Sequence, residues 1–383
     1  MRNKSGFVVA LVLMLAFAVA GAGAEGAVPP DAASARPARV CAAVNSSDFA
    51  ACHAYARPFA STSPTGLDPA TIKSVYNFPT SLTAGTGTTI AIVDAFNDPT
   101  AEADLAVFST QYGLPACTTA NGCFSKVNQT GGTTYPRTDP GWALEISLDI
   151  QWAHAIAPSA HILLVEAISN SNANLYRAED YAAAHANYVS NSWGGSESST
   201  ESSNDRHFSR AGVSFFASAG DSGLPAQYPS SSPNVISVGG TTLHFVNGVF
   251  SSETGWSSGG GGCSAYETAT AAQSSFSQYA QVNCGGKRAT PDVSLDADPA
   301  SGVSVYDSTR YQGQSGWWTV GGTSASSPMW AGRAAATGVA VNSAVVYGSS
   351  LTFRDITSGN NGASCLAGFD LCSGRGSWIN TAP

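Results

Sequence analysis

Short apolar segments alternate with helical patterns along most of the chain, and this alternation constrains the fold more than any other feature. The apolar segments are continuous runs rather than every-second-residue patterns, which is typical of strands buried on both faces in a parallel sheet. We therefore predict one α/β domain over residues 65–383, in which helices flank both faces of a mostly parallel central sheet. The expected strands are 88–95, 161–167, 188–195, 213–223 and 234–243, and the expected helices are 100–113, 141–158 and 175–186.

The residues before this domain have the pattern of an exported protein. Arg2 and Lys4 precede an apolar run that is shorter than the roughly 20 residues a membrane span requires, and small residues follow it. We interpret residues 1–24 as a secretory signal peptide. Residues 25–64 are rich in Ala, Pro and Ser without a sustained period, so we expect a short, loosely ordered leader there.

The cysteines agree with export into an oxidising compartment. Eight are present, and no CxxC spacing that would favour a zinc site occurs. The simplest of the many pairings that eight cysteines allow joins sequence neighbours. It predicts one disulfide within the leader, Cys41–Cys52, together with Cys117–Cys123, Cys263–Cys284 and Cys365–Cys372.

The charge content excludes several classes of partner. Lys and Arg number 17 against 26 Asp and Glu, which gives a net charge of −9 with only 11% charged residues. Binding of nucleic acid or of anionic lipid would require a basic stripe, and the sequence has none. We therefore expect no binding to nucleic acid or to membranes. We further expect a secreted protein that is a monomer.

The segment "VGGTSASSPMWAG", Val320–Gly332, contains the candidate nucleophile. Its glycines lead into an alanine-rich helical pattern, so Ser324 is predicted at a helix N-terminus, where backbone N–H groups lack partners. That position suits a serine nucleophile. The alternative is that Thr323 or Ser324 only caps the helix, and the presence of a proton acceptor decides between the two.

A pair of carboxylates is the best candidate for that acceptor. Six histidines are present, but none lies in an obvious catalytic setting. Glu145 and Asp149 are four residues apart in an apolar helical pattern, which places both on one helix face. Two carboxyls in one pocket titrate at different pH values, so one can accept a proton while the other orients it. The alternative is a polar stripe on an amphipathic helix.

Asp221 is the candidate for stabilising an oxyanion. It follows the apolar run Val213–Ala217, at the carboxyl end of a strand, where ligands bind in open α/β sheets. A protonated Asp can donate a hydrogen bond to the oxygen that becomes negative when Ser324 attacks a carbonyl. The alternative is an Asp that only forms a turn.

These four residues and their surroundings resemble the sedolisins, the serine-carboxyl peptidases with a subtilisin-like fold. The likeness covers nearly all of residues 66–383. It implies that Ser324 is the nucleophile, Glu145 the general base, Asp149 the carboxyl that orients Glu145, and Asp221 the oxyanion acid. The motifs that carry it are "GGTSASSP", the "ExxxD" helix that continues into "HAIAPSAHI", "SAGDSG", "RATPDVSLDADP", "RDITSGNNG" and "GFDLCSGRGS".

The resemblance also implies a calcium site near the carboxyl terminus. Asp355 and Asp370 match the family's side-chain ligands, and oxygen ligands in a loop are what Ca²⁺ requires. Ile356, Leu366 and Gly368 match the carbonyl donors, although the family usually has Gly where Leu366 stands.

The segment "SNSWGG", residues 190–195, is similar to the segment that pairs with an extended peptide in subtilisin-like folds. We expect Trp193 and Gly194 to contact the substrate, with Trp193 lining a side-chain pocket.

Sedolisins commonly carry a long amino-terminal pro-segment, and residues 25–64 are too short to form one.

The implied function is that of a secreted, acid-acting serine peptidase that hydrolyses proteins or peptides through an acyl-enzyme on Ser324. Two alternatives stay open. One is a Ser/His/Asp hydrolase that uses Asp94, although the histidine motif of subtilisins is missing from the sequence. The other is a secreted, calcium-stabilised binding protein that has lost catalysis.

Overall fold

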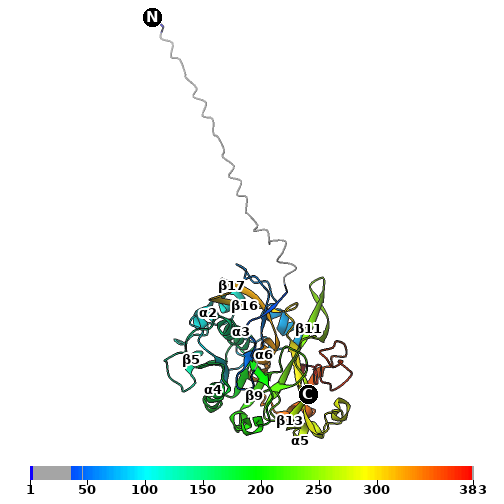
Figure 1. Cartoon of the computed structure of the whole chain (residues 1–383). Coiled ribbons are helices and arrows are strands. Elements are labelled where there is room, and N and C mark those ends of the chain that lie inside the picture. Colours follow the sequence, from blue (N-terminus) through cyan, green and yellow to red (C-terminus); the bar gives the residue numbers. More distant parts are fainter. Residues whose placement is uncertain (3–35, 45, 382–383) are drawn as a thin grey trace. The chain divides into compact units, whose positions relative to one another are not determined.

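The computed structural model of the chain describes residues 1–2, 36–44 and 46–381 (Figure 1). One compact unit begins at Arg36 and includes the whole predicted α/β domain. The predicted signal peptide, apart from Met1 and Arg2, and the leader up to residue 35 lie outside the described residues. No helix among the described residues is long and apolar enough to cross a membrane.

An eight-stranded sheet forms the centre of the unit. Its strands follow the order β12-β11-β9-β7-β4-β6-β5, and β15 also pairs with β11. All neighbours are parallel except β11 and β12, which confirms the predicted fold class. The strands are β4 (Thr89–Ala95), β5 (Phe124–Asn128), β6 (His161–Ala167), β7 (Tyr188–Asn191), β9 (Ser214–Ser218), β11 (Ile236–Val246), β12 (Val249–Gly255) and β15 (Val293–Asp296).

The longer helices cover this sheet, and two of them carry the candidate site. α3 (Pro140–Ile156) packs against α6 (Thr323–Thr337), and both contact β4 (Figure 1). The residues 90–93 of β4 are completely buried, so both faces of this strand are covered. The predicted helices 100–113 and 175–186 are present as α2 (Ala101–Tyr112) and α4 (Asn172–His185).

The expected strand 188–195 is in fact two strands in two different sheets. β7 belongs to the central sheet, whereas β8 (Trp193–Ser196) lies between β2 (Ala51–Cys52) and β10 (Gln227–Tyr228). Ser192 joins the two strands, and its carbonyl oxygen accepts a hydrogen bond from the hydroxyl of Ser324 at 3.1 Å. The break between the two strands therefore places the carbonyl group of Ser192 beside the candidate nucleophile.

Smaller elements complete the unit. A four-stranded sheet has the order β1-β3-β17-β16, and two hairpin-like pairs are β13 with β14 and β18 with β19. Their bounds are β1 (Ala38–Arg39), β3 (Tyr55–Ala56), β16 (Val303–Tyr311), β17 (Gln314–Gly321), β13 (Gly262–Thr268), β14 (Lys287–Thr290), β18 (Leu351–Arg354) and β19 (Ser377–Thr381); the short helices are α1 (Pro69–Tyr76), α5 (Ala271–Ser274) and α7 (Ser343–Tyr347).

The described part of the leader is built into this unit. β1 pairs with β3, β3 pairs with β17, and β2 pairs with β8, so the leader contributes strands to two sheets. The compact unit begins at Arg36 and is not divided at residue 65. The boundary between the leader and a catalytic domain at residue 65 therefore stays a prediction.

All four predicted disulfides are present, and no cysteine among them is free. Each closes a short loop, with sequence separations from 6 to 21 residues. The bridges are Cys41–Cys52, Cys117–Cys123, Cys263–Cys284 and Cys365–Cys372.

Candidate active site

Ser324 lies in the first turn of α6, as its sequence context predicts. Gly322 is the N-cap residue, with a φ of 104° that only glycine adopts readily. A Cβ on Gly322 would approach the His53 carbonyl oxygen to 2.1 Å and Asp221 Oδ2 to 2.8 Å. The glycine therefore leaves room for a backbone carbonyl beside Ser324, which is itself completely buried.

Glu145 and Asp149 lie one turn apart on α3, which is buried on all sides. Asp139 starts the helix by accepting hydrogen bonds from the N–H groups of Gly141 and Trp142. Neither carboxylate has a hydrogen-bond partner among the described residues. Because α3 packs on α6, the two carboxylates and Ser324 belong to one interior region.

Burial sets the titration of this pair. It raises the pKa of Glu145 well above its usual range, and the charges of Asp149 and then Asp94 raise it further. The hydroxyl of Ser324 lowers the pKa of Glu145, although this hydroxyl donates its hydrogen bond to the Ser192 carbonyl. Burial likewise raises the pKa of Asp149. One proton shared by the pair is the arrangement that burial favours.

Asp94 is a third carboxyl of this cluster. The sequence predicts only the pair Glu145 and Asp149, and the structure adds Asp94 to it. It lies near the carboxyl end of β4, it is completely buried, and its oxygens have no hydrogen-bond partner among the described residues. Burial raises its pKa well above the usual range, and the charges of Asp149 and Glu166 add to this. The groups acting on Asp94 are thus carboxylates, whereas the Ser/His/Asp alternative requires a histidine.

Asp221 lies beside the N-terminus of α6. Its Oδ1 atom accepts hydrogen bonds from the backbone N–H of Thr323 at 2.8 Å and from the Thr323 hydroxyl at 2.9 Å. Its Oδ2 atom is buried without a partner. Burial raises the pKa of Asp221 to about 7, against the Thr323 hydrogen bonds and the charge of Arg39. In acid, Oδ2 therefore carries a proton that it can donate.

The expected peptide-binding segment has two different faces. The Trp193 side chain is core: it is 1% exposed, and its ring N–H donates to the Val93 carbonyl at 2.8 Å. It therefore lines no side-chain pocket here. The backbone of Trp193 and Gly194 pairs in antiparallel fashion with Cys52 and Ala51, which is the interaction expected for an extended peptide.

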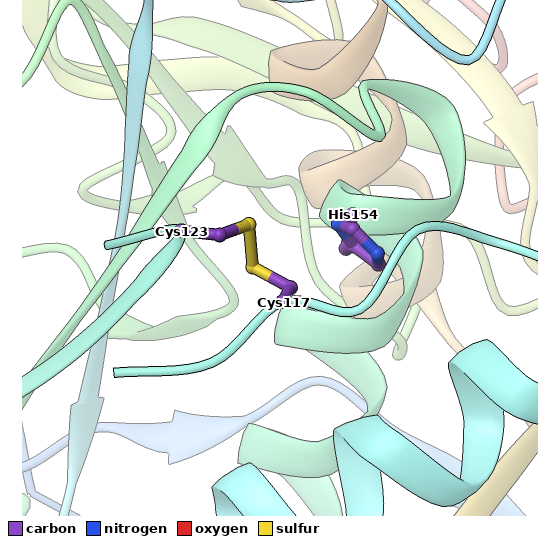
Figure 2. Close-up of side chains that lie close together, drawn as sticks. All are labelled: Cys117, Cys123 and His154. Carbon is purple, nitrogen blue, oxygen red and sulfur yellow. A yellow bond between two sulfur atoms is a disulfide. The ribbon is translucent and has the colours of Figure 1, made fainter. Parts of the chain in front are cut away.

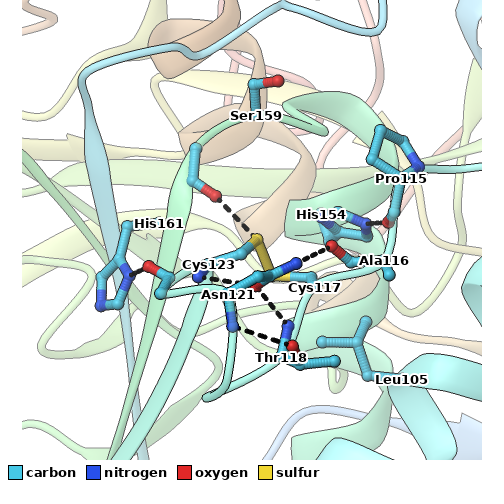
Figure 3. The surroundings of a disulfide bond; sticks show 12 residues. Leu105, Pro115, Ala116, Cys117, Thr118, Asn121, Cys123, His154, Ser159 and His161 are labelled. Carbon is cyan, nitrogen blue, oxygen red and sulfur yellow. Dashed lines mark hydrogen bonds between the residues drawn. A yellow bond between two sulfur atoms is a disulfide. The ribbon is translucent and has the colours of Figure 1, made fainter.

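The histidine rings are occupied elsewhere. The Nδ1 atom of His53 lies 2.7 Å from the Ser218 hydroxyl, and burial lowers the pKa of His53 to about 4. His154 contacts the Pro115 carbonyl at 2.9 Å, beside the Cys117–Cys123 disulfide (Figure 3).

Among the residues that the structure describes, two groups of side chains are close enough to hold a metal ion. The first contains Cys117, Cys123 and His154, but the two sulfur atoms are joined to each other, so they are unavailable as thiolate ligands (Figure 2). The second is made of three buried carboxylates, Asp98, Asp104 and Asp307. Hydrogen bonds from Thr100, Ser308 and Thr309 hold these carboxylates in place.

The residues of the expected calcium site lie on one loop near the carboxyl terminus. Asp355 Oδ2 accepts a hydrogen bond from the Gly368 N–H at 2.8 Å, and Asp370 Oδ2 accepts one from the Leu366 N–H at 2.6 Å. Gly368 has a φ of 88°. Ile356 packs on the Cys365–Cys372 bridge, which closes the loop. The loop thus brings two carboxylates to one turn of backbone.

This geometry agrees with comparisons to known proteins. A model of the subtilase family matches residues 141–356, more than half of the chain. Kumamolisin of Bacillus sp. (strain MN-32) is 32% identical over 362 residues, covering 83% of this chain and 63% of kumamolisin. Sedolisin of Pseudomonas sp. (strain 101) is 27% identical over 373 residues, covering 84% of this chain and 60% of sedolisin. The chain thus spans about three fifths of the length of these relatives.

A solved structure supports the same assignment. Pseudomonas sedolisin, in complex with two molecules of pseudo-iodotyrostatin, superposes with a TM-score of 0.69 at 28% identity, covering 83% of this chain and 96% of that one. The fold alone is also similar to that of sphericase, with a TM-score of 0.53 at 21% identity. The chain belongs to the subtilase family and is a sedolisin-like member of it.

Proposed function

We propose that the chain is a secreted, acid-acting serine-carboxyl peptidase that cleaves peptide bonds in proteins or peptides. The observation that carries the proposal is a buried group made of Ser324, the two unpartnered carboxylates of α3, which packs against α6, and Asp221 with one unpartnered oxygen. Three carboxyl groups with unpartnered oxygens, those of Glu145, Asp149 and Asp221, are costly in a protein interior unless they serve a purpose. The similarity to kumamolisin and sedolisin supports the same function.

The proposed reaction uses each group once. Ser324 Oγ attacks the substrate carbonyl and passes its proton to Glu145, which Asp149 holds in position. The Ser324 N–H and protonated Asp221 donate hydrogen bonds to the negative oxygen. Glu145 then gives its proton to the leaving amine, and water hydrolyses the acyl-enzyme by the reverse sequence of proton transfers.

The acidic working range follows from Asp221. Its carboxyl must be protonated to act as a donor, and its pKa of about 7 means that activity declines as pH rises through neutrality. The carboxylate pair must keep one negative charge, so activity also declines in strong acid. Few charged residues and four disulfides suit a protein exported to such conditions.

We propose that Ca²⁺ binds the loop of Asp355 and Asp370, with the carbonyl groups of Ile356, Leu366 and Gly368 as further ligands. The donor set fits, because both carboxylates contact the same turn and each retains lone pairs beyond its hydrogen bonds. Bound calcium would hold this loop in shape and take no part in the reaction.

Covalent labelling tests the proposed function. A peptide aldehyde should form a hemiacetal with Ser324 at pH 4 to 5, detected by mass spectrometry after borohydride trapping or by NMR of a ¹³C-labelled carbonyl. Ser324→Ala is the control. A binding protein that has lost catalysis would give no adduct, and a histidine-based hydrolase would keep most of its activity in Glu145→Gln.

A further inference from the structure

A histidine nitrogen without a hydrogen-bond partner lies beside the Cys117–Cys123 disulfide. His154, in the last turn of α3, is completely buried, and its Nε2 atom lies 2.9 Å from the Pro115 carbonyl oxygen. A carbonyl oxygen only accepts, so Nε2 carries the hydrogen and Nδ1 presents a lone pair. Nδ1 has no partner in the part of the chain that the structure describes. Such a buried nitrogen costs free energy unless it has a use.

The ring of His154 is within ligand reach of both sulfur atoms (Figure 2). A ring nitrogen and the Sγ atoms of Cys117 and Cys123 all lie within 4.8 Å of one another. Thiolates and neutral imidazoles are the ligands that zinc prefers, at about 2.3 Å and 2.0 Å from the ion, so two ligands of one tetrahedral ion lie roughly 3.5 to 3.8 Å apart. Small movements therefore suffice to form a zinc site once the sulfur atoms are no longer joined.

The turn that carries the two cysteines is also held by hydrogen bonds that involve no sulfur. Asn121 Oδ1 accepts from the N–H groups of Thr118 and Cys123, each at 3.0 Å (Figure 3). The side-chain amide of Asn121 donates to the Ala116 carbonyl at 2.7 Å. These contacts remain when the disulfide is open, so they keep both cysteines close to His154.

A cavity gives an ion access to this place. It has a volume of about 520 Å³ and reaches Cys123, which is partly exposed, whereas Cys117 is completely buried. Its lining also includes Ala116, Gly122 and Ala160. The cavity provides a path to the sulfur atoms and room for a water molecule as the fourth ligand.

We propose that the chain binds a zinc ion through Cys117, Cys123 and His154 before this disulfide forms, and that closure of the disulfide releases the ion. The place is thus zinc-bound while its cysteines are reduced and metal-free once they are oxidised. The unpartnered nitrogen is a ligand in the first state and is left without a partner in the second. The inference does not depend on the proposed peptidase function.

The change of state is a balanced exchange when oxidised glutathione is the oxidant. One zinc-bound thiolate attacks the glutathione disulfide, which forms a mixed disulfide and releases one glutathione thiolate. The second cysteine thiolate attacks the mixed disulfide, closes the Cys117–Cys123 bond and displaces the second glutathione thiolate. Two electrons pass from the cysteines to glutathione, and each released thiolate takes up a proton. Zn²⁺ then leaves, because the thiolate and not the disulfide is the metal ligand.

Alkylation shows which cysteines zinc protects. The Ser324→Ala chain, in which peptidase activity plays no part, is treated with a phosphine until mass spectrometry shows the Cys117–Cys123 bridge open. It is then alkylated with iodoacetamide with and without Zn²⁺, and the labelled peptides are identified. We expect zinc to slow the alkylation of these two cysteines by about tenfold or more.

Two other cysteines are internal controls for this protection. Cys263 is also partly exposed and is paired with Cys284, and the metal-ligand groups found among the described residues do not include either of them. Both should be alkylated at the same rate with and without zinc. Equal protection of all four cysteines, or protection of none, would overturn the inference.

His154→Gln separates a three-residue site from a pair of thiols. It should lose most of the zinc protection of both cysteines, because an amide offers no comparable nitrogen lone pair. His161→Gln is the matched control, since the two ring nitrogens of His161 are already occupied by the Ser125 hydroxyl and the Gly122 carbonyl. Protection that persists in His154→Gln, or that is lost equally in both variants, would contradict the proposed ligand set.

Release of the ion tests whether the two states exclude each other. The zinc-loaded, reduced chain is freed of excess metal and treated with oxidised glutathione in the presence of a colorimetric zinc chelator. We expect about one Zn²⁺ ion per chain to be released, at the rate at which the Cys117–Cys123 bond forms. Cys117→Ser/Cys123→Ser should release none. Zinc that stays bound after the bridge has closed, or an equal release from this variant, would overturn the inference.

Discussion

The backbone N–H of Ser324 donates a 3.0 Å hydrogen bond to the carbonyl oxygen of His53, although the two residues are 271 positions apart in the chain. The N–H of Ser324 thus donates to a carbonyl oxygen, as the N–H groups of an oxyanion hole do. This single contact ties the leader to the chemistry of the site. It also explains why Ser324 has no exposed surface, since the leader covers it.

Removing the charge of Asp94 should shift the acid limb of the pH–rate profile. The charge of Asp94 raises the pKa of Glu145, after burial and Asp149. Asp94→Asn should therefore lower the pH at which the pair retains one negative charge, by roughly half to one unit. The profile of kcat/KM between pH 2.5 and 6 measures this shift.

Glu179→Gln is the control for Asp94→Asn. Glu179 is equally buried, but it is not among the groups that raise the pKa of Glu145. An unshifted acid limb in Asp94→Asn, or an equal shift in Glu179→Gln, would exclude Asp94 from the carboxylate cluster.

Stability should increase as the solution is acidified from pH 8 to pH 5. Burial raises the pKa of Asp98 to about 6 and that of Asp307 to about 9, whereas an unfolded Asp titrates near 3.9. The folded state binds these protons more tightly, so their stabilisation is fully present below about pH 4 and is lost as pH rises through 6 to 9. The lowered pKa values of His53 and His154, both about 4, oppose this trend. Carboxyl groups with a raised pKa are more numerous, and they include Asp94, Glu166 and Asp221.

The melting temperature of Ser324→Ala, which cannot digest itself, is the measurement for this prediction. We expect it to be several degrees higher at pH 5 than at pH 8, and Asp307→Asn should flatten the difference. Asp48→Asn, at an exposed position, should leave it unchanged. A melting temperature that rises toward pH 8 would contradict the predicted direction.

Calcium should stabilise the protein without being needed for the chemical step. A ligand that binds only the folded state adds about 2.7 kcal/mol to the free energy of unfolding when its free concentration is one hundred times Kd. This corresponds to several degrees in melting temperature. A chelator should remove this stabilisation from the parent protein. Asp355→Asn should show the lower value from the start and respond little to chelator.

Asp355 is the better residue to change, because it is exposed and a single hydrogen bond from Gly368 reaches its side chain. Asp370 also anchors the loop through the N–H groups of Leu366, Cys372 and Ser373, so its replacement would disturb the loop even without a metal. Identical melting curves with and without chelator in the parent would remove the calcium proposal.

Much of this structure follows from local sequence. The continuous apolar runs at 89–95 and 161–167 are strands of a parallel sheet because only burial on both faces suits such residues. The spacing of Glu145 and Asp149 on an apolar helix places both carboxyls in the interior. Disulfides between near neighbours form because short loops bring the cysteines together at low entropic cost.

Other features depend on long-range packing that the local pattern does not contain. Trp193 stands in the expected peptide-binding segment, but its ring turns inward to reach the Val93 carbonyl. The leader lacks periodicity because its strands are only two residues long, yet it pairs with β8 and β17. Asp94, like Asp221, is a carboxylate near the carboxyl end of a buried strand. This sequence pattern is sufficient to predict Asp94 as a member of the carboxylate cluster.

The proton on Asp221 tests the central claim most directly. The measurement is kcat/KM on a quenched peptide from pH 3 to 9, with the parent enzyme, Asp221→Asn and Asp221→Ala. We predict that parental activity falls as pH rises through about 7 and that Asp221→Ala loses about 10²- to 10³-fold at the optimum. Asn at this position donates a hydrogen bond at every pH, so Asp221→Asn should stay active above pH 7. Parental activity that instead increases toward pH 8, or full activity in Asp221→Ala, would contradict the serine-carboxyl mechanism.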